Sequence, residues 1–225
     1  MNETLLIIKM LFAFSSILLA LRLFGKAGMY AWIAVASILA NIIVAKNIEV
    51  FGIDATMGNV MFASTFLATD IISEKYGAKA ARKGVYIGLF SVLLYLVISQ
   101  FCLRFMPSEM DMVHGSMVGL FTLAPRICLA SVSMYFLANL LDVVLYDALR
   151  KRFDGKRMWL RNNICTIICN SIENFGFVVL AFAGVYPVEE LLIIAISTSV
   201  IEAAIAVCDT TFLYLAKKVQ PIGKD

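Results

Sequence analysis

Long apolar segments alternate with short polar segments along the whole chain. Seven apolar segments can be identified, at residues 5–24, 29–46, 56–73, 84–106, 122–147, 163–184 and 188–216. Each is close to or above the roughly 20 residues that a helix needs to cross a bilayer. The pattern therefore predicts an all-α, polytopic membrane protein with seven spans joined by short loops.

The composition agrees with a membrane protein. The chain has 225 residues, of which 61% are hydrophobic and 16% charged, and its mean hydropathy is +0.89. These values are too apolar for a soluble domain, so we expect a single transmembrane domain over residues 1–225. Segment 5–24 is longer than a signal-peptide core, and no basic region precedes it, so we predict that it is retained as a helix.

Basic residues predict the orientation of the chain. Fifteen of the 19 Lys and Arg residues follow segments one, three, five or seven, and the other four are Lys9, Lys46, Arg104 and Arg126. Because positive residues stay cytoplasmic, we predict an outside N-terminus and a cytoplasmic tail at residues 218–225. Topology and contact with anionic lipid explain the net charge of +3, so the expected partner is the bilayer and not nucleic acid.

Five carboxylates qualify as intramembrane acids: Asp70, Asp142, Glu173, Glu202 and Asp209. A charge at the bilayer centre costs about 2.5–3.5 kcal/mol on insertion scales, so such acids usually mark a transport pathway. Counted along the helices at about 1.5 Å per residue, the last four are expected at similar depth, in the inner half of the membrane. Asp70 is expected closer to the cytoplasmic boundary.

Two of these acids follow an asparagine by three residues, as Asn139-x-x-Asp142 and Asn170-x-x-Glu173. This spacing places each pair on one helix face, and we expect both pairs to face one polar cavity. The candidate substrate-binding residues are completed by Asn41 and Arg126, near the outer ends of segments two and five. For Arg126, a role as counter-ion and a snorkelling position at the outer surface both remain open.

Neither a metal site nor catalysis is indicated. Cys165 and Cys169 share a helix face but lack further ligands, and His114 lies in a loop, so we predict no metal or other cofactor. No phosphate-binding loop is present, which excludes ATP as the direct energy source. An enzyme is disfavoured because no nucleophile motif accompanies the acids.

Several short motifs together resemble one known family. The first is Phe66–Gly77, with the sequence FLATDIISEKYG, followed by Ala80-Ala81-Arg82. The others are Asn139–Asp142, Trp159–Asn163 with Cys165-Thr166, Asn170 with Glu173, Gly184-Val185, and Asp209-Thr210 with Tyr214. Over nearly all of residues 38–216 the chain resembles the queuosine-precursor transporter family, also called the vitamin uptake transporter (VUT) family. The resemblance implies a six-helix core at residues 29–217, and residues 1–28 then form an additional N-terminal transmembrane helix.

The resemblance implies import of a 7-deazaguanine across the bacterial inner membrane for tRNA modification. Its substrate would be a small nucleobase or nucleoside precursor: 7-cyano-7-deazaguanine, its aminomethyl analogue, or queuine. One carboxylate can accept the N1–H and 2-amino hydrogens of a guanine-like edge, and an amide can meet the carbonyl. An ammonium group on the substrate would need a second carboxylate. Whether Glu173 or Asp142 binds the purine edge stays open.

The chain departs from the family pattern at three positions. Glu173 stands where Asp is usual, Asn139 where Gln is common, and Thr211 in place of a frequent Pro, which bears on the pose of the substrate. The alternative function is the substrate-binding subunit of an energy-coupling-factor transporter, a similarly sized helical protein that depends on partner chains. A homodimer is compatible with a transporter of this size, although the sequence shows no specific interface.

Overall fold

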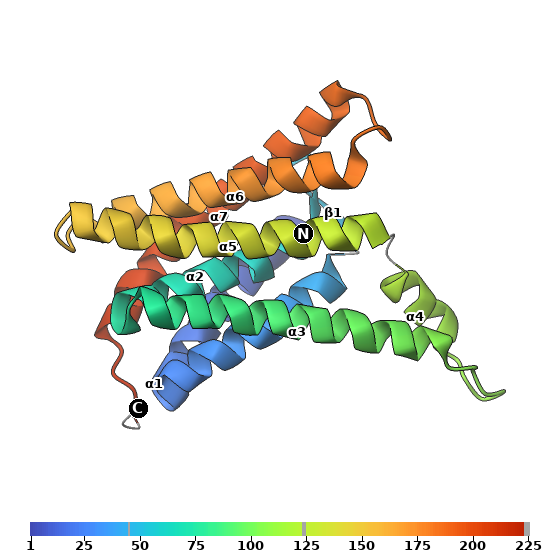
Figure 1. Ribbon diagram of the computed structural model, residues 1–225, viewed down its shortest axis with the longest axis horizontal. Coiled ribbons are helices and arrows are strands. Elements are labelled where there is room, and N and C mark those ends of the chain that lie inside the picture. Colours follow the sequence, from blue (N-terminus) through green and yellow to red (C-terminus); the bar gives the residue numbers. More distant parts are fainter. Residues whose placement is uncertain (45, 123–124, 223–225) are drawn as a thin grey trace.

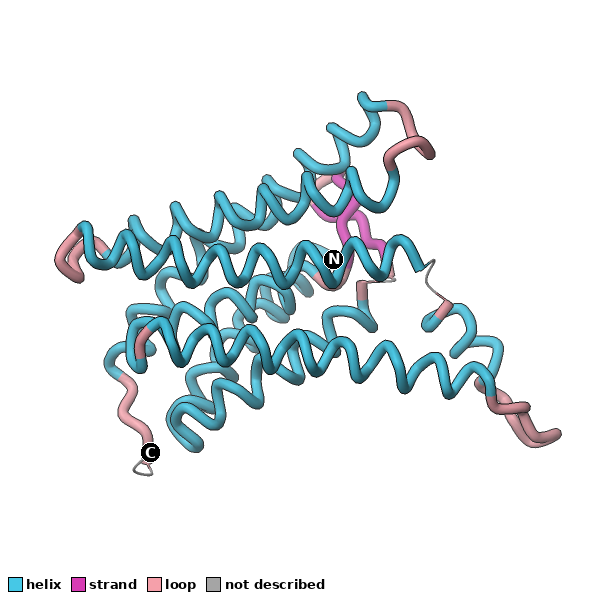
Figure 2. The backbone as a smooth tube through the Cα atoms, viewed as in Figure 1, coloured by secondary structure: helices cyan, strands magenta, loops and turns pink. Residues whose placement is uncertain are grey.

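The computed structural model describes residues 1–44, 46–122 and 125–222, and these residues form seven helices and one β-hairpin (Figure 1). The elements in order are α1 (Asn2–Ile43), β1 (Asn47–Val50), β2 (Ile53–Thr56), α2 (Asn59–Tyr76), α3 (Ala78–Arg104), α4 (His114–Phe121), α5 (Pro125–Arg152), α6 (Met158–Phe182) and α7 (Val188–Lys218). The predicted all-α polytopic class is confirmed in these described ranges. Figure 2 shows the helices running side by side, with loops gathered at the two ends of the bundle.

Among the described residues, five helices are long and apolar enough to cross a membrane. These spans are Asn2–Ile43, Ala78–Arg104, Leu129–Arg152, Met158–Phe182 and Val188–Lys218. Large apolar side chains cover their outer faces, among them Phe90 at 66% exposure and Ile193 at 65%. Such surfaces would be unfavourable in water but suit contact with lipid. The predicted segment 56–73 corresponds to α2, which carries Asp70, Glu74 and Lys75 within its 18 residues.

Helix α1 contains two of the predicted segments and folds back on itself. A straight helix of its 42 residues would be about 63 Å long, yet Asn2 at one end donates a hydrogen bond of 2.9 Å to the carbonyl of Glu49, just past the other end. The reversal occurs at Gly25, which has φ 55° and ψ −134°, a conformation that only glycine adopts readily. A Cβ atom at Gly28 would overlap the carbonyl oxygen of Ala20, so the two halves of α1 are in backbone contact.

The core is centred on α2. Fourteen of its 18 residues are buried, and it packs against α1, α3, α5 and α7. The first half of α1 belongs to the same core, where Phe14 is fully buried and its ring lies 5.2 Å from that of Phe212 in α7. The segment at residues 5–24 is therefore an integral part of the bundle.

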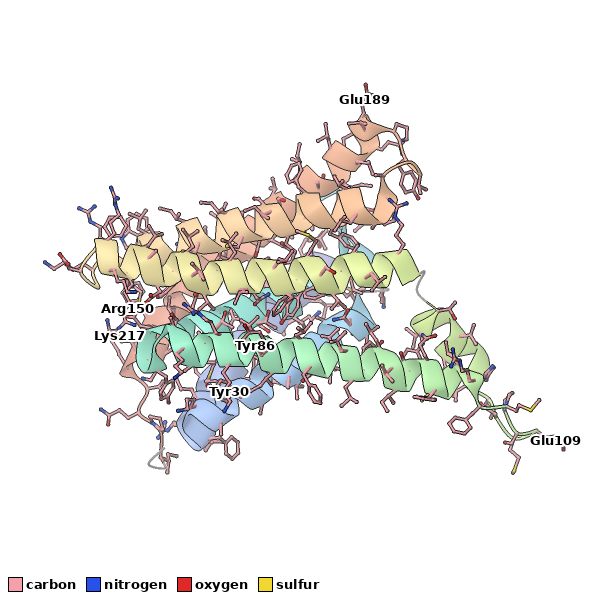
Figure 3. The ribbon with its side chains drawn as sticks, viewed as in Figure 1. Tyr30, Tyr86, Glu109, Arg150, Glu189 and Lys217 are labelled. Carbon is pink, nitrogen blue, oxygen red and sulfur yellow. The ribbon has the colours of Figure 1, made fainter. Side chains whose placement is uncertain are left out.

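The two ends of the bundle differ in charge. The turn in α1, the α2–α3 junction, the α5–α6 loop and the end of α7 form what we term the basic end, where Figure 3 labels Arg150 and Lys217. The β-hairpin, α4 and the α6–α7 loop form the hairpin end, the side of Glu109 and Glu189 in Figure 3. Lys224, one of the predicted cytoplasmic residues, lies outside the described residues.

The sequence pattern did not predict the hairpin or α4. Strands β1 and β2 pair antiparallel with Val50 opposite Ile53. The two turn residues, Phe51 and Gly52, both have positive φ, at 54° and 75°, as in the type I′ turns that suit the twist of two strands. The chain enters α2 directly from this hairpin, which places α2's first residues at the hairpin end.

Candidate functional site

A cavity of about 420 Å³ lies in the half of the bundle nearest the hairpin end. Its size is within the range of pockets that bind small molecules. The lining residues come from all the long helices and from β2, and the polar ones are Asn41, Thr56, Asn59, Ser131, Glu173, Asn174, Tyr186, Thr198 and Glu202. A cavity shared by so many helices can change shape when the helices move relative to one another.

The cavity contains two carboxyl groups on neighbouring helices. Glu173 of α6 and Glu202 of α7 both line it. Asn174 holds Glu202 in place by donating a hydrogen bond of 2.9 Å from Nδ2 to Oε2, and it also donates one of 3.3 Å to Ser199. Glu202 is thus oriented by the protein, whereas Glu173 has no hydrogen bond to another described side chain in the structure. The cavity wall includes no described Lys or Arg, so its charge favours hydrogen-bond donors and cations.

A free hydrogen-bond donor also faces this region. Thr56 donates a hydrogen bond of 2.6 Å to Oδ1 of Asn59, which fixes the orientation of the amide. The Nδ2 of Asn59 is buried and has no partner among the described residues. A buried donor without a partner is costly, so a ligand carbonyl at this position would be stabilising.

Aromatic rings form part of the cavity wall. Phe177, Phe182 and Tyr186 follow one another in edge-to-face contact, with ring centroids 5.8 Å and 5.7 Å apart. Phe62 lines the cavity from α2 and contacts Tyr135 at 5.9 Å. Flat rings of this kind suit a flat heteroaromatic ligand.

A second polar cluster lies closer to the basic end, and we term it the inner acid cluster: Asp70, Asp142 and Asp209, with Asn162. Its three carboxyl groups are at most 1% exposed. Asn162 donates a hydrogen bond of 2.7 Å to Oδ1 of Asp209, and Asp70 lies against Asp142. Three helices, α2, α5 and α7, supply the acids, and α6 supplies the amide.

The basic end is closed by ion pairs that converge on Glu74 of α2. Its carboxylate lies 3.3 Å from Arg161 of α6, 3.3 Å from Lys217 of α7 and 3.9 Å from Arg150 of α5. The hydroxyl of Tyr146 in α5 also donates to it, at 3.4 Å. We call this group the inner ion cluster. It joins α2 to α5, α6 and α7 at the basic end.

The candidate residues from the sequence fall into four groups. Asn41, Glu173 and Glu202 line the cavity, and Asp70, Asp142 and Asp209 form the inner acid cluster. Asn139 and Asn170 are buried outside the cavity wall, and the Nδ2 of Asn139 donates to the carbonyl of Tyr135 in its own helix. Arg126 donates to the carbonyls of Leu180 and Ala183 at 2.6 Å and 2.9 Å, capping the last turn of α6.

The expectation of four acids at one depth was wrong. Glu173 lies nine residues from the hairpin-end terminus of α6 at Phe182, or about 14 Å along the axis. Asp142 lies ten residues from the opposite, basic-end terminus of α5 at Arg152. Estimated span boundaries caused the error, because α6 starts at Met158 and not at residue 163, and α5 extends to Arg152.

Sequence reasoning missed Asn59, Asn174, Glu74 and Arg161. Arg161 was counted as a loop residue, but the structure buries it completely within α6. Glu74 and Arg161 both lie within or beside motifs of the family resemblance, which was the available signal. Nothing in the sequence pattern distinguished Asn59 and Asn174 from surface amides.

A bundle of long apolar helices around a polar cavity is the architecture of a polytopic membrane transporter, and the comparisons give the same class. Residues 56–216 match the family described as "Putative vitamin uptake transporter", and the chain belongs to this family.

Curated relatives support the same assignment. The "Probable queuosine precursor transporter" of Bacillus subtilis (strain 168) is 38% identical over 209 residues, 92% of this chain and 91% of the relative. The "Queuosine precursor transporter" of Escherichia coli (strain K12) is 28% identical over 145 residues, 64% of this chain and 62% of the relative. A Haemophilus influenzae protein named as a probable queuosine precursor transporter is 28% identical over 134 residues. These names do not favour the energy-coupling-factor alternative. No solved structure matches the chain.

Proposed function

We propose that this protein imports a queuosine precursor, a 7-deazaguanine, across the bacterial inner membrane. The names of the relatives support this substrate class. The observation that carries the proposal is the composition of the cavity: two carboxyl groups, a free amide donor and a row of aromatic rings within about 420 Å³. Each of these matches one chemical feature of the substrate.

The purine edge binds Glu173 in this proposal, and not Asp142. A guanine-like edge offers two parallel donors, N1–H and the 2-amino group, which one carboxylate accepts in a bidentate arrangement. Glu173 lines the cavity, whereas Asp142 is 0% exposed. The unpartnered Nδ2 of Asn59 is the donor for the ring carbonyl, and Glu202 accepts the ammonium of an aminomethyl or queuine substituent.

The same proposal assigns seven passes and an outward-facing state. The halves of α1 count as two spans because Asn2 and Glu49 lie at the same end, and α2 is a span enclosed by its neighbours. With the basic end in the cytoplasm, the N-terminus lies outside and the C-terminus inside. The cavity then faces the outside while the inner ion cluster around Glu74 closes the cytoplasmic side.

The test uses cells that cannot synthesise the precursor and carry this gene as their only transporter for it. Queuosine in tRNA is measured after labelled 7-cyano-7-deazaguanine, its aminomethyl analogue or queuine is supplied. We expect rescue by the wild type. Glu173→Gln loses charge-assisted hydrogen bonds, and a loss of about 1.5–3 kcal/mol corresponds to a roughly 10- to 150-fold weaker apparent affinity.

Glu189→Gln is the matched control, because Glu189 is exposed at the start of α7 (Figure 3) and does not line the cavity. It should leave uptake unchanged. Full uptake by Glu173→Gln at limiting precursor would contradict the assigned role of Glu173. No rescue by a wild-type protein shown to be in the membrane would refute the substrate class.

A further inference from the structure

Two carboxyl groups of the inner acid cluster lie beside each other and are shielded from water. Asp70 of α2 and Asp142 of α5 are neighbours, and they are 1% and 0% exposed. None of their four oxygens accepts a hydrogen bond from a described N–H or O–H group. Two neighbouring carboxylates that are buried without hydrogen-bond donors are not stable when both are ionised, so the pair stays together only while the two groups hold a proton.

We propose that Asp70 and Asp142 form a proton-binding site, and that movement of this proton into the cell drives import of the substrate held in the cavity. The inference rests on the proposed import function. A proton is the ligand that the contact can take and release without needing space between the helices. The site is separate from the cavity, since neither residue lines it.

The charged and titratable groups around the pair come from four helices. Asp209 of α7 adds a third carboxyl group and Arg161 of α6 an opposite charge. The remaining groups are Glu74 of α2, Tyr146 of α5, and Cys165 and Cys169 of α6. From α1 and α3, Lys26 and Lys83 lie over the rings of Tyr76 and Tyr30. Arg161 is also paired with Glu74 at 3.3 Å, so the three acids of the cluster keep negative charge that a bound proton can neutralise.

Unpartnered polar groups next to the pair independently indicate an exchangeable ligand. Arg161 is fully buried, and its Nε and Nη1 have no hydrogen-bond partner among the described residues. The hydroxyl of Ser73 is likewise buried and unpartnered, and it lies three residues after Asp70 on the same helix face. Buried groups in this condition are costly and are typical of sites where protons or water are exchanged.

Titratable side chains lie on both sides of the pair, toward the basic end and toward the cavity. Tyr146 lies four residues after Asp142, and Glu74 four residues after Asp70, so each continues the same face toward the basic end. The Tyr146 hydroxyl donates to Glu74 at 3.4 Å, which joins the two faces. On the cavity side, Cys169 contacts Asp142 and lies one turn from Glu173. The pair is thus placed between the cavity and the cytoplasmic end.

In the proposed transport cycle, each proton taken up from the outside is released to the cytoplasm. One proton enters from the outside and is held between Asp70 and Asp142, which keeps α2 against α5. After substrate binding and opening of the inner ion cluster, the proton leaves to the cytoplasm. The two carboxylates then repel each other, and the contact can re-form only when another proton arrives from outside.

The experiment uses the purified full chain in liposomes with labelled 7-aminomethyl-7-deazaguanine and the internal pH dye pyranine. With the outside one pH unit more acidic, a coupling of one proton per substrate gives about tenfold accumulation, together with acidification of the interior on substrate addition. In Asp70→Asn and Asp142→Asn, the ratio of uptake with and without the gradient should fall to about one. Asp147→Asn, which removes a surface ion pair of 2.7 Å with Lys151, should keep the wild-type ratio.

A second measurement does not depend on transport. Infrared difference spectra of the wild type between acidic and alkaline pH should show the carbonyl band of a protonated carboxyl group, and this band should be reduced in the two Asn variants. The proton site would be overturned if Asp70→Asn and Asp142→Asn exchanged labelled substrate and kept the wild-type ratio of uptake with and without the gradient. Absence of that infrared band in the wild type would overturn it as well. Absence of substrate exchange with the band present would refute the proposed import function and leave the proton site standing.

Discussion

Replacing Glu74 with glutamine removes a carboxylate that three cations share at the basic end. The pairs differ in strength because Lys217 is 56% exposed and Arg150 35%, whereas Arg161 is 0% exposed. Exposed pairs contribute about 0–1 kcal/mol, but removing one partner of a buried pair costs about 3–5 kcal/mol. If about 2 kcal/mol of this free energy favours the closed over the open state of the basic end, its loss raises the open population about 30-fold.

Chemical labelling of a native cysteine can measure how often the basic end opens. Cys165 and Cys169 are fully buried in α6 beside the inner acid cluster, and we expect them to become reachable when the basic end opens. In a variant that retains Cys165 and has the other cysteines replaced by serine, labelling by N-ethylmaleimide should accelerate by about 30-fold in Glu74→Gln. Asp147→Asn, which breaks a surface pair at the same end, should label at the parent rate. Equal labelling rates for Glu74→Gln and its parent, with both proteins folded, would refute the closing role of the inner ion cluster.

Three further substitutions test the fold and the cavity. Gly28→Ala places a Cβ against the backbone of Ala20 and should lower the thermal midpoint of unfolding in detergent by several degrees. The control is Gly119→Ala in α4, whose Cβ meets nothing within 4 Å, and it should leave the midpoint unchanged or raised. Equal midpoints for the two variants would contradict the folded-back α1. Arg126→Ala leaves two carbonyls at the end of α6 uncapped and should lower the same midpoint, with Arg126→Lys restoring part of the loss. Asn174→Ala frees the Glu202 carboxylate and should raise the KM for aminomethyl precursors more than for the cyano precursor; an equal rise for both would contradict an ammonium site at Glu202.

Much of the fold could be predicted from apolar segments because hydrophobic length directly determines which segments can cross a bilayer. The predicted segments 84–106, 122–147, 163–184 and 188–216 correspond to α3, α5, α6 and α7. The short elements were not predicted, because β1 and β2 are four residues each and leave too little periodicity to detect. The reversal in α1 depends on the backbone angles of Gly25, which a hydrophobicity pattern does not reveal.

The candidate site was predicted in part, for a physical reason. Intramembrane acids are costly enough that Glu173, Glu202, Asp70, Asp142 and Asp209 stood out individually. Their division into two groups depends on helix ends, and an error of five residues moves a side chain by about 7.5 Å along the axis. That distance is enough to assign an acid to the wrong cluster.

The burial of α2 has a consequence for how the protein is made. With Asp70, Glu74 and Lys75 among its 18 residues, this helix is a poor substrate for direct partitioning from the translocon into lipid. Its polar side chains are shielded by α5 and α7, which are synthesised after it. We therefore expect stable insertion of α2 to depend on the later helices, and we expect a chain interrupted before α5 to expose Asp70 to lipid and become a target for membrane quality control.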